Sequence, residues 1–68
     1  MEKKTARLKN WFLGIANRHV YGEVYGHYRI EDGTRVMTSN IQNITKNEDE
    51  WIIETLNTIY ICRLEDAA

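Results

Sequence analysis

The sequence predicts an all-β protein, either a five-stranded, strongly bent antiparallel sheet or a small SH3-like barrel. Val, Ile and Thr number 17 among the 68 residues, against eight Ala and Leu, and β-branched side chains favour strands over helices. Apolar and polar residues alternate with a period of two in successive short runs, which is typical of strands with one buried face. Closing such a sheet into a barrel would remove its exposed edges.

The first predicted strand begins at Lys9. From there Trp11, Leu13 and Ile15 point to one side of the strand, and we expect that face to be buried. The preceding residues, 1–8, are charged and have no such alternation over their whole length. We expect them to form a basic arm that is either disordered or a short N-terminal helix.

A second and longer alternation covers residues 20–30. Its predicted inward face consists of Val20, Gly22, Val24, Gly26, Tyr28 and Ile30. The two glycines on this face would let the strand coil sharply and let another backbone approach closely. The chain contains no proline, so no edge strand is protected by one, and an edge could pair with another chain. A small chain without disulfides, metal or cofactor also often gains stability by self-association. We therefore expect a homo-oligomer.

Three shorter strands complete the predicted sheet. The Asp-Gly step at 32–33 supplies the positive φ that a tight hairpin turn needs. Strands are then predicted at residues 35–44, 51–53 and 58–64, with turns at 31–34, 46–49 and 56–57. Residues 65–68 are expected to be a frayed tail. The whole chain, 1–68, is predicted to be one domain.

Composition excludes several classes of protein. A net charge of −1 argues against a wholly basic nucleic-acid binder, although a local basic face is still open. The single cysteine, Cys62, cannot form an internal disulfide, and no ligand set for zinc is visible, so we expect no metal and no cofactor. The chain has no apolar run of membrane-spanning length. These features favour a protein of the reducing cytoplasm, with no membrane partner.

Catalysis is not predicted. His19 and His27 are eight residues apart with no Cys or carboxylate at ligand spacing, and Cys62 lies in an apolar run, where a thiol usually acts as a small hydrophobe. No nucleophile with a base and no carboxylate pair is evident. The chain is therefore expected not to be an enzyme.

The outward face of the second predicted strand is the candidate binding site. Planar and charged side chains, which protein interfaces and nucleobases both use, would stand there in a row. We expect the contact residues to be Tyr21, Tyr25, His27 and Arg29, with Asp32 and Arg35 beside the hairpin and Thr38 and Ser39 beyond it. The alternative interpretation is that these side chains cover a second hydrophobic layer or a dimer interface.

Charge is unevenly distributed along the chain. Residues 1–19 have a charge of +4 and residues 48–68 a charge of −5. A basic beginning could contact nucleic-acid phosphates, and an acidic end could meet a basic protein groove. The alternative is that the two ends simply attract each other and keep the domain soluble.

Two local patterns resemble known proteins. Val20-Tyr21-Gly22-Glu23-Val24-Tyr25-Gly26-His27 resembles the second strand of Sm-like RNA-binding proteins, which implies a small RNA-binding barrel. A whole-chain pattern consists of Trp11, Gly-Glu-Val-Tyr-Gly-His at 22–27, Asp-Gly-Thr at 32–34, Thr-Ser-x-Ile at 38–41 and Glu-Thr-x-x-x-x-Tyr at 54–60. This pattern is similar to that of small proteins encoded in phage and integrated elements of gut bacteria.

The second resemblance implies a phage or mobile-element protein that acts in the bacterial cytoplasm. Small non-enzymes of that setting, such as anti-CRISPR proteins, inhibit host defence by occupying a site on a defence protein. The sequence therefore predicts a non-catalytic protein that binds and inhibits a bacterial protein partner, such as a nucleoprotein defence complex. The second hypothesis is an RNA-, DNA- or nucleotide-binding small β-barrel.

Overall fold

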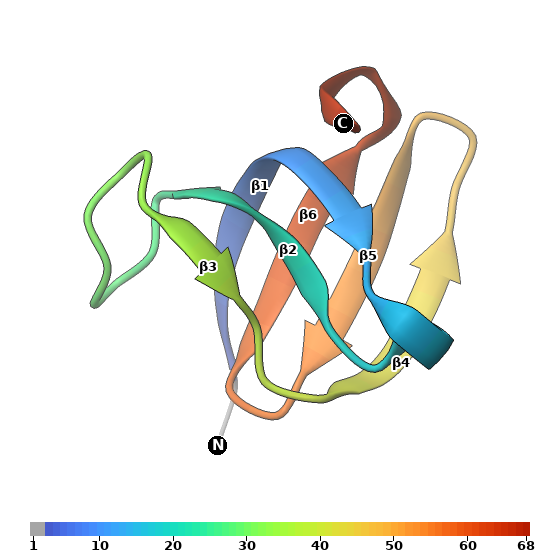
Figure 1. Ribbon diagram of the computed structural model, residues 1–68, viewed down its shortest axis with the longest axis horizontal. Helices are drawn as coiled ribbons and strands as arrows, with labels where there is room; N and C mark the ends of the chain where they lie inside the picture. Colours follow the sequence, from blue (N-terminus) through green and yellow to red (C-terminus); the bar gives the residue numbers. More distant parts are fainter. Residues whose placement is uncertain (1–2) are drawn as a thin grey trace.

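Six strands form one curved, mixed sheet in the computed structural model, which describes residues 3–68 (Figure 1). The sheet order is β3-β2-β1-β6-β5-β4. The strands are β1 (Lys4–Leu13), β2 (Val20–Tyr25), β3 (Arg35–Met37), β4 (Ile41–Lys46), β5 (Glu50–Thr55) and β6 (Thr58–Arg63). Two 3-10 turns, η1 (Ile15–Asn17) and η2 (Leu64–Asp66), follow β1 and β6.

The predicted all-β class is confirmed, but two details of the prediction are wrong. The sheet has six strands, not five, and it is open, with β3 and β4 at its edges, so the expected SH3-like barrel is not formed. The sheet is also not wholly antiparallel, because β1 pairs with β6 in parallel. The chain is thus two three-stranded meanders, β1-β2-β3 and β4-β5-β6, joined by their first and last strands.

Strand β1 replaces most of the expected basic arm. Ala6 and Leu8 are buried on the inner face, whereas Thr5 and Arg7 point outward, so the alternation already begins near residue 4. This strand was not predicted because Ala6 and Leu8 are the only apolar residues between Lys4 and Leu8, and the residues around them are polar or charged. The prediction of a disordered arm or a helix is therefore wrong for residues 4–8, and residues 1–2 lie outside the described part of the chain.

The core lies on the concave face of the sheet. The members of this cluster come from β1, β2, β5 and β6: Ala6, Leu8, Trp11, Val20, Val24, Ile53, Tyr60 and Cys62. The indole of Trp11 packs on that of Trp51 with ring centroids 5.5 Å apart. Its Nε1–H donates a hydrogen bond to the Arg63 carbonyl at 2.8 Å. Trp11 therefore ties the end of β1 to the end of β6.

A bulge between Lys9 and Phe12 alters the expected faces of the first strand. Trp11 is buried as expected, but Leu13 is only half-buried and Ile15, which lies in η1, is 94% exposed. Gly22 of β2 faces this bulge. A Cβ on Gly22 would lie 3.1 Å from both the Lys9 carbonyl oxygen and the Trp11 Cβ. The expected close backbone approach at Gly22 is confirmed.

The long second strand predicted over residues 20–30 ends instead at Tyr25. Gly26 has a φ of +71°, a left-handed conformation that stops the strand, and its N–H donates to the Asp32 Oδ1 at 2.8 Å. Residues 26–34 form a loop rather than a tight hairpin. Gly33 does adopt the expected positive φ, +87°, and its N–H donates to the Val24 carbonyl at 2.7 Å.

The third predicted strand, 35–44, is divided into β3 and β4 by a bend. Thr38 is buried there, and its Oγ1 accepts the Val20 N–H at 3.1 Å while donating to the Ser39 carbonyl. The Ile41 N–H donates to the Arg18 carbonyl at 2.7 Å. The buried threonine replaces sheet hydrogen bonds at the bend, which lets the chain pass from one edge of the sheet to the other.

The expected frayed tail is also wrong, because residues 64–68 lie against the sheet. After η2, Ala67 forms a parallel bridge with Trp11, and the Ala68 N–H donates to the Trp11 carbonyl at 2.9 Å. The bulge in β1 leaves that carbonyl free to accept this bond.

Replacing Leu8 tests the structural role of β1. Leu8→Ala should lower the free energy of unfolding by about 2–5 kcal/mol, because Leu8 is fully buried in the core. Thr5→Ala, on the outward face of the same strand, should lower it by less than about 1 kcal/mol. Urea denaturation followed by tryptophan fluorescence measures both. Equal midpoints for the two variants would mean that this segment is an arm and not a central strand.

Candidate functional site

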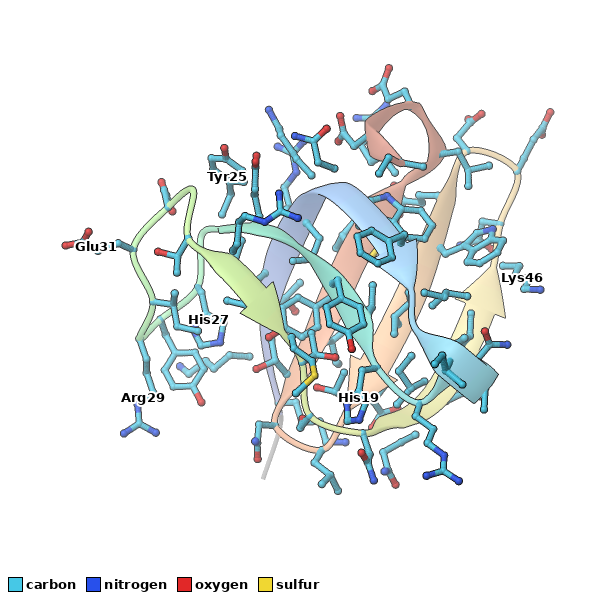
Figure 2. All side chains as sticks on the ribbon, in the orientation of Figure 1. His19, Tyr25, His27, Arg29, Glu31 and Lys46 are labelled. Atoms are coloured by element: carbon cyan, nitrogen blue, oxygen red, sulfur yellow. The ribbon has the colours of Figure 1, made fainter. Side chains whose placement is uncertain are left out.

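A groove opens at one side of the sheet and is the candidate functional site. It has a volume of about 460 Å³ and lies between the loop 26–34, the bend after β3 and the β5–β6 turn. Its lining residues are His27, Tyr28, Arg29, Ile30, Val36, Met37, Thr38, Ser39, Asn57, Thr58 and Tyr60. Figure 2 shows His27 and Arg29 on the loop at the left of the molecule, and Lys46 on the opposite side.

His27 contacts two aromatic rings and makes two hydrogen bonds at one wall of the groove. The ring stacks on Tyr28 with centroids 4.7 Å apart and an interplanar angle of 13°, and it lies 6.4 Å from the Tyr60 centroid. Its Nδ1 accepts the Arg29 backbone N–H at 3.0 Å. The Nε2 of a neutral ring must then carry the proton, which it can donate to the Thr58 Oγ1 at 3.4 Å.

Some polar side chains of the groove form hydrogen bonds within the protein, and others do not. Thr38 bonds to the backbone through its hydroxyl, and Thr58 bonds to His27. Within residues 3–68, the side chains of Arg29, Ser39 and Asn57 make no hydrogen bond to the protein, and Arg29 forms no ion pair. These three side chains are therefore available to a ligand.

Burial shifts the pKa of two side chains of β6: Tyr60, which lines the groove, and Cys62, which lies in the core. Burial raises the pKa of the Tyr60 hydroxyl, and a hydrogen bond with Thr58 partly offsets this rise. Burial also raises the pKa of the Cys62 thiol to about 12. Both groups stay protonated at neutral pH. A buried neutral thiol is a structural group and not a nucleophile.

The structure divides the eight predicted contact residues into two groups. His27, Arg29, Thr38 and Ser39 line the groove, whereas Tyr21, Tyr25, Asp32 and Arg35 do not. The predicted row along one strand is wrong, because β2 ends at Tyr25 and His27 and Arg29 lie in the following loop. Figure 2 shows Tyr25 on the side of the loop opposite to Arg29.

Sequence reasoning missed part of the groove. Tyr28 was expected to point inward but is 52% exposed, and Tyr60, Asn57 and Thr58 were not singled out. The only local signal was the predicted turn at 56–57. That turn lies beside the loop 26–34 only because the sheet curves, which no local pattern reveals.

A second surface lies on the convex face of β1, β2 and β3. Phe12 is opposite Tyr21, and Tyr21 is opposite Met37, so three large side chains form one cross-strand row. The Phe12 and Tyr21 rings stack with centroids 5.1 Å apart and an interplanar angle of 11°. Phe12 is 44% exposed and Met37 59% exposed. We call these three residues the apolar row.

The cations on the convex face of β1, β2 and β3, which are Arg7, Lys9 and Arg35, each lie beside a carboxylate or an aromatic ring. Among the described residues, four cations form ion pairs: Lys3 with Glu54 at 2.6 Å, Arg63 with Glu65 at 3.1 Å, Arg7 with Asp66 at 3.9 Å and Arg35 with Glu23 at 3.9 Å. Lys9 and Lys46 lie over the rings of Tyr25 and Trp51. The basic beginning of the chain thus meets its acidic end within the fold, as the charge-attraction alternative expects.

Among residues 3–68, no three His, Cys, Asp or Glu side chains gather as metal ligands would. In the same range, no helix has the length and apolar character needed to cross a membrane. The groove and the apolar row are the two candidate binding surfaces.

These features define a small all-β protein with an open mixed sheet, a lateral groove and an exposed apolar row. Comparisons of the chain with protein-family models, with curated proteins and with solved structures found no match.

Cys62 should resist thiol reagents in the folded protein. With a pKa near 12 in place of the ordinary 9.0, its thiolate fraction at pH 8 is about 1,000-fold lower than that of a free thiol, and the side chain is buried. Ellman's reagent should react only after urea is added. The unfolded chain loses this proton first, so the free energy of unfolding should also fall as pH rises from 9.0 toward 12. Rapid labelling of the native protein would contradict the buried position.

The two histidines should show opposite neutral tautomers. Nδ1 of His27 accepts a backbone N–H, whereas Nδ1 of His19 must donate to the Thr38 carbonyl at 2.8 Å. Ring-nitrogen NMR at about pH 8.5, where imidazole is ordinarily neutral, should find the proton on Nε2 of His27 and on Nδ1 of His19. A proton on Nδ1 of His27 would show that the loop 26–34 is arranged differently.

Proposed function

We propose that this is a non-catalytic protein that docks on a bacterial protein partner through the apolar row. The observation that carries this proposal is the exposure of Phe12 and Met37 on either side of Tyr21. Aromatic side chains and Met are enriched in the centres of protein interfaces. Tyr21 and Phe12 are already stacked and lose little freedom on binding, which favours their use as anchors.

The distribution of charge supports a protein partner over a nucleic-acid strand. Binding along a phosphate backbone needs several cations on one face, and each contact releases counterions. Here Lys3, Arg7 and Arg35 are beside carboxylates, and Lys9 lies over an aromatic ring. The cations that the sequence placed in a basic arm lie in or beside β1, and none of them lines the groove.

The biological setting that we propose rests on the sequence resemblance to small phage and mobile-element proteins. In that setting the partner is a bacterial defence effector in the cytoplasm, such as a nucleoprotein CRISPR–Cas complex, and binding inhibits it. The open edges at β3 and β4 also support self-association of the protein into a homo-oligomer. Sedimentation velocity measures the oligomeric state directly.

Substitutions in the apolar row test the proposal. Phe12→Asp and Met37→Asp should each weaken partner binding about tenfold or more, because a charge replaces an anchor at the interface. Leu64→Asp is the matched control, since Leu64 is 41% exposed and lies in η2, not in the row. Circular dichroism should show that all three variants stay folded.

The measurement is a pull-down from nuclease-treated bacterial lysate, followed by affinity measurement with the captured protein. Wild type and Leu64→Asp should retain the same partner, and the two row variants should lose it. If nuclease abolishes capture and no protein is retained from untreated lysate either, the partner is a nucleic acid and the proposal is wrong. Equal capture by all the variants would place the interface elsewhere.

A further inference from the structure

The groove has the size of a small-molecule site, and it shares Met37 with the apolar row. Its volume of about 460 Å³ lies within the range of ligand pockets, roughly 300–1,000 Å³. Ile30 and Val36 are half-buried and pack against the core, so they supply an apolar floor. Polar side chains from the loop 26–34 and from the β5–β6 turn stand above it. An apolar floor with a few convergent polar groups is the usual composition of a ligand site.

An aromatic platform stands at one wall of the groove. Tyr28 stacks on His27, and His27 is braced by Tyr60 and by its two hydrogen bonds. Tyr28 uses one ring face for this stack and is still 52% exposed, so its other face is open. An exposed tyrosine ring held by a stack behind it suits a planar ligand ring.

The charge of the groove selects an anion. Arg29 carries the only formal charge among the lining side chains, and no carboxylate lines the groove within the described part of the chain. Arg29 is not used in an ion pair, in contrast to Arg7, Arg35 and Arg63. A guanidinium in this state matches a single phosphate group, to which it can present two donors.

Asn57 and Ser39 add a means of reading the edge of a ring. The Asn57 amide offers both donor and acceptor groups, and the Ser39 hydroxyl offers both as well. Neither side chain is used by the protein within residues 3–68. Nucleobases are recognised by this combination of stacking and paired donor and acceptor contacts.

We propose that the groove binds a nucleoside monophosphate, with the base on Tyr28, the phosphate on Arg29 and the base edge beside Asn57. A carboxylate alone would use Arg29 but would leave the aromatic platform without a partner. The single cation distinguishes this site from a surface that follows a polynucleotide, which needs many. The same chemistry could come from a free nucleotide or from the terminal nucleotide of a strand.

Titration with adenosine 5′-monophosphate, followed by amide NMR of the full chain, tests the proposal. The expected result is saturable shifts confined to residues 27–30, 38–39 and 57–60. Adenosine should bind at least tenfold more weakly than the monophosphate, and inorganic phosphate more weakly still. A dinucleotide that binds more tightly than the monophosphate would assign the site to a strand end, and equal affinity would assign it to the free nucleotide.

Variants separate the contributions of ring and charge. Arg29→Gln should weaken monophosphate binding at least tenfold and leave adenosine binding unchanged, whereas Tyr28→Leu should weaken both. Arg18→Gln removes an exposed cation that does not line the groove and should change neither. Phe12→Asp, which disrupts the apolar row, should also bind the monophosphate as wild type does.

Three outcomes would overturn the proposal. One is the absence of groove shifts at millimolar monophosphate in the folded wild-type protein. Another is equal binding of the monophosphate and inorganic phosphate, which would show that no ring is recognised. The third is an equal loss of affinity in Arg29→Gln and Arg18→Gln, because the attraction would then depend only on net charge.

Discussion

The parallel pairing of β1 with β6 is the contact on which the rest of the structure depends. It is the one connection between the two meanders within the sheet, and it joins strands near opposite ends of the chain. Leu8 and Cys62 are partners in this pairing and are both fully buried. The ion pair of Lys3 with Glu54 and the hydrogen bond from Trp11 to the Arg63 carbonyl secure its two ends. Its long sequence separation makes it costly to form early in folding.

This arrangement positions both proposed surfaces. Because the sheet curves without closing, the chain must cross from the β3 edge to the β4 edge through the bend at Thr38, and the groove lies beside that crossing. The convex side of β1, β2 and β3 faces away from the core and presents the apolar row. Met37 belongs to both surfaces, since it ends the row and lines the groove. A protein on the row and a ligand in the groove would therefore meet at one side chain.

Charge has a structural role before any role in binding. The sequence has a basic beginning and an acidic end, and the fold brings them together at Lys3–Glu54 and Arg7–Asp66. Ion pairs of this kind at a surface contribute little stability each. Arg29 is left in a groove without carboxylates. A groove with a single cation suits a small anion better than a nucleic-acid strand, which carries many phosphates.

The sequence by itself determined the all-β class, the inward positions of Val20 and Val24, the need for glycine at Gly22 and the positive φ at Gly33. Each of these follows from local alternation or from the conformation of one residue. Tertiary structure alone decided the parallel pairing of β1 with β6, the end of β2 at Tyr25 and the docking of residues 64–68. It also decided which side chains form the groove, because these come from three segments that are distant in the sequence. Alternation in the sequence shows which side of a strand is buried. Which strands become neighbours depends on the whole sheet, because the inward faces of all six strands must be buried together.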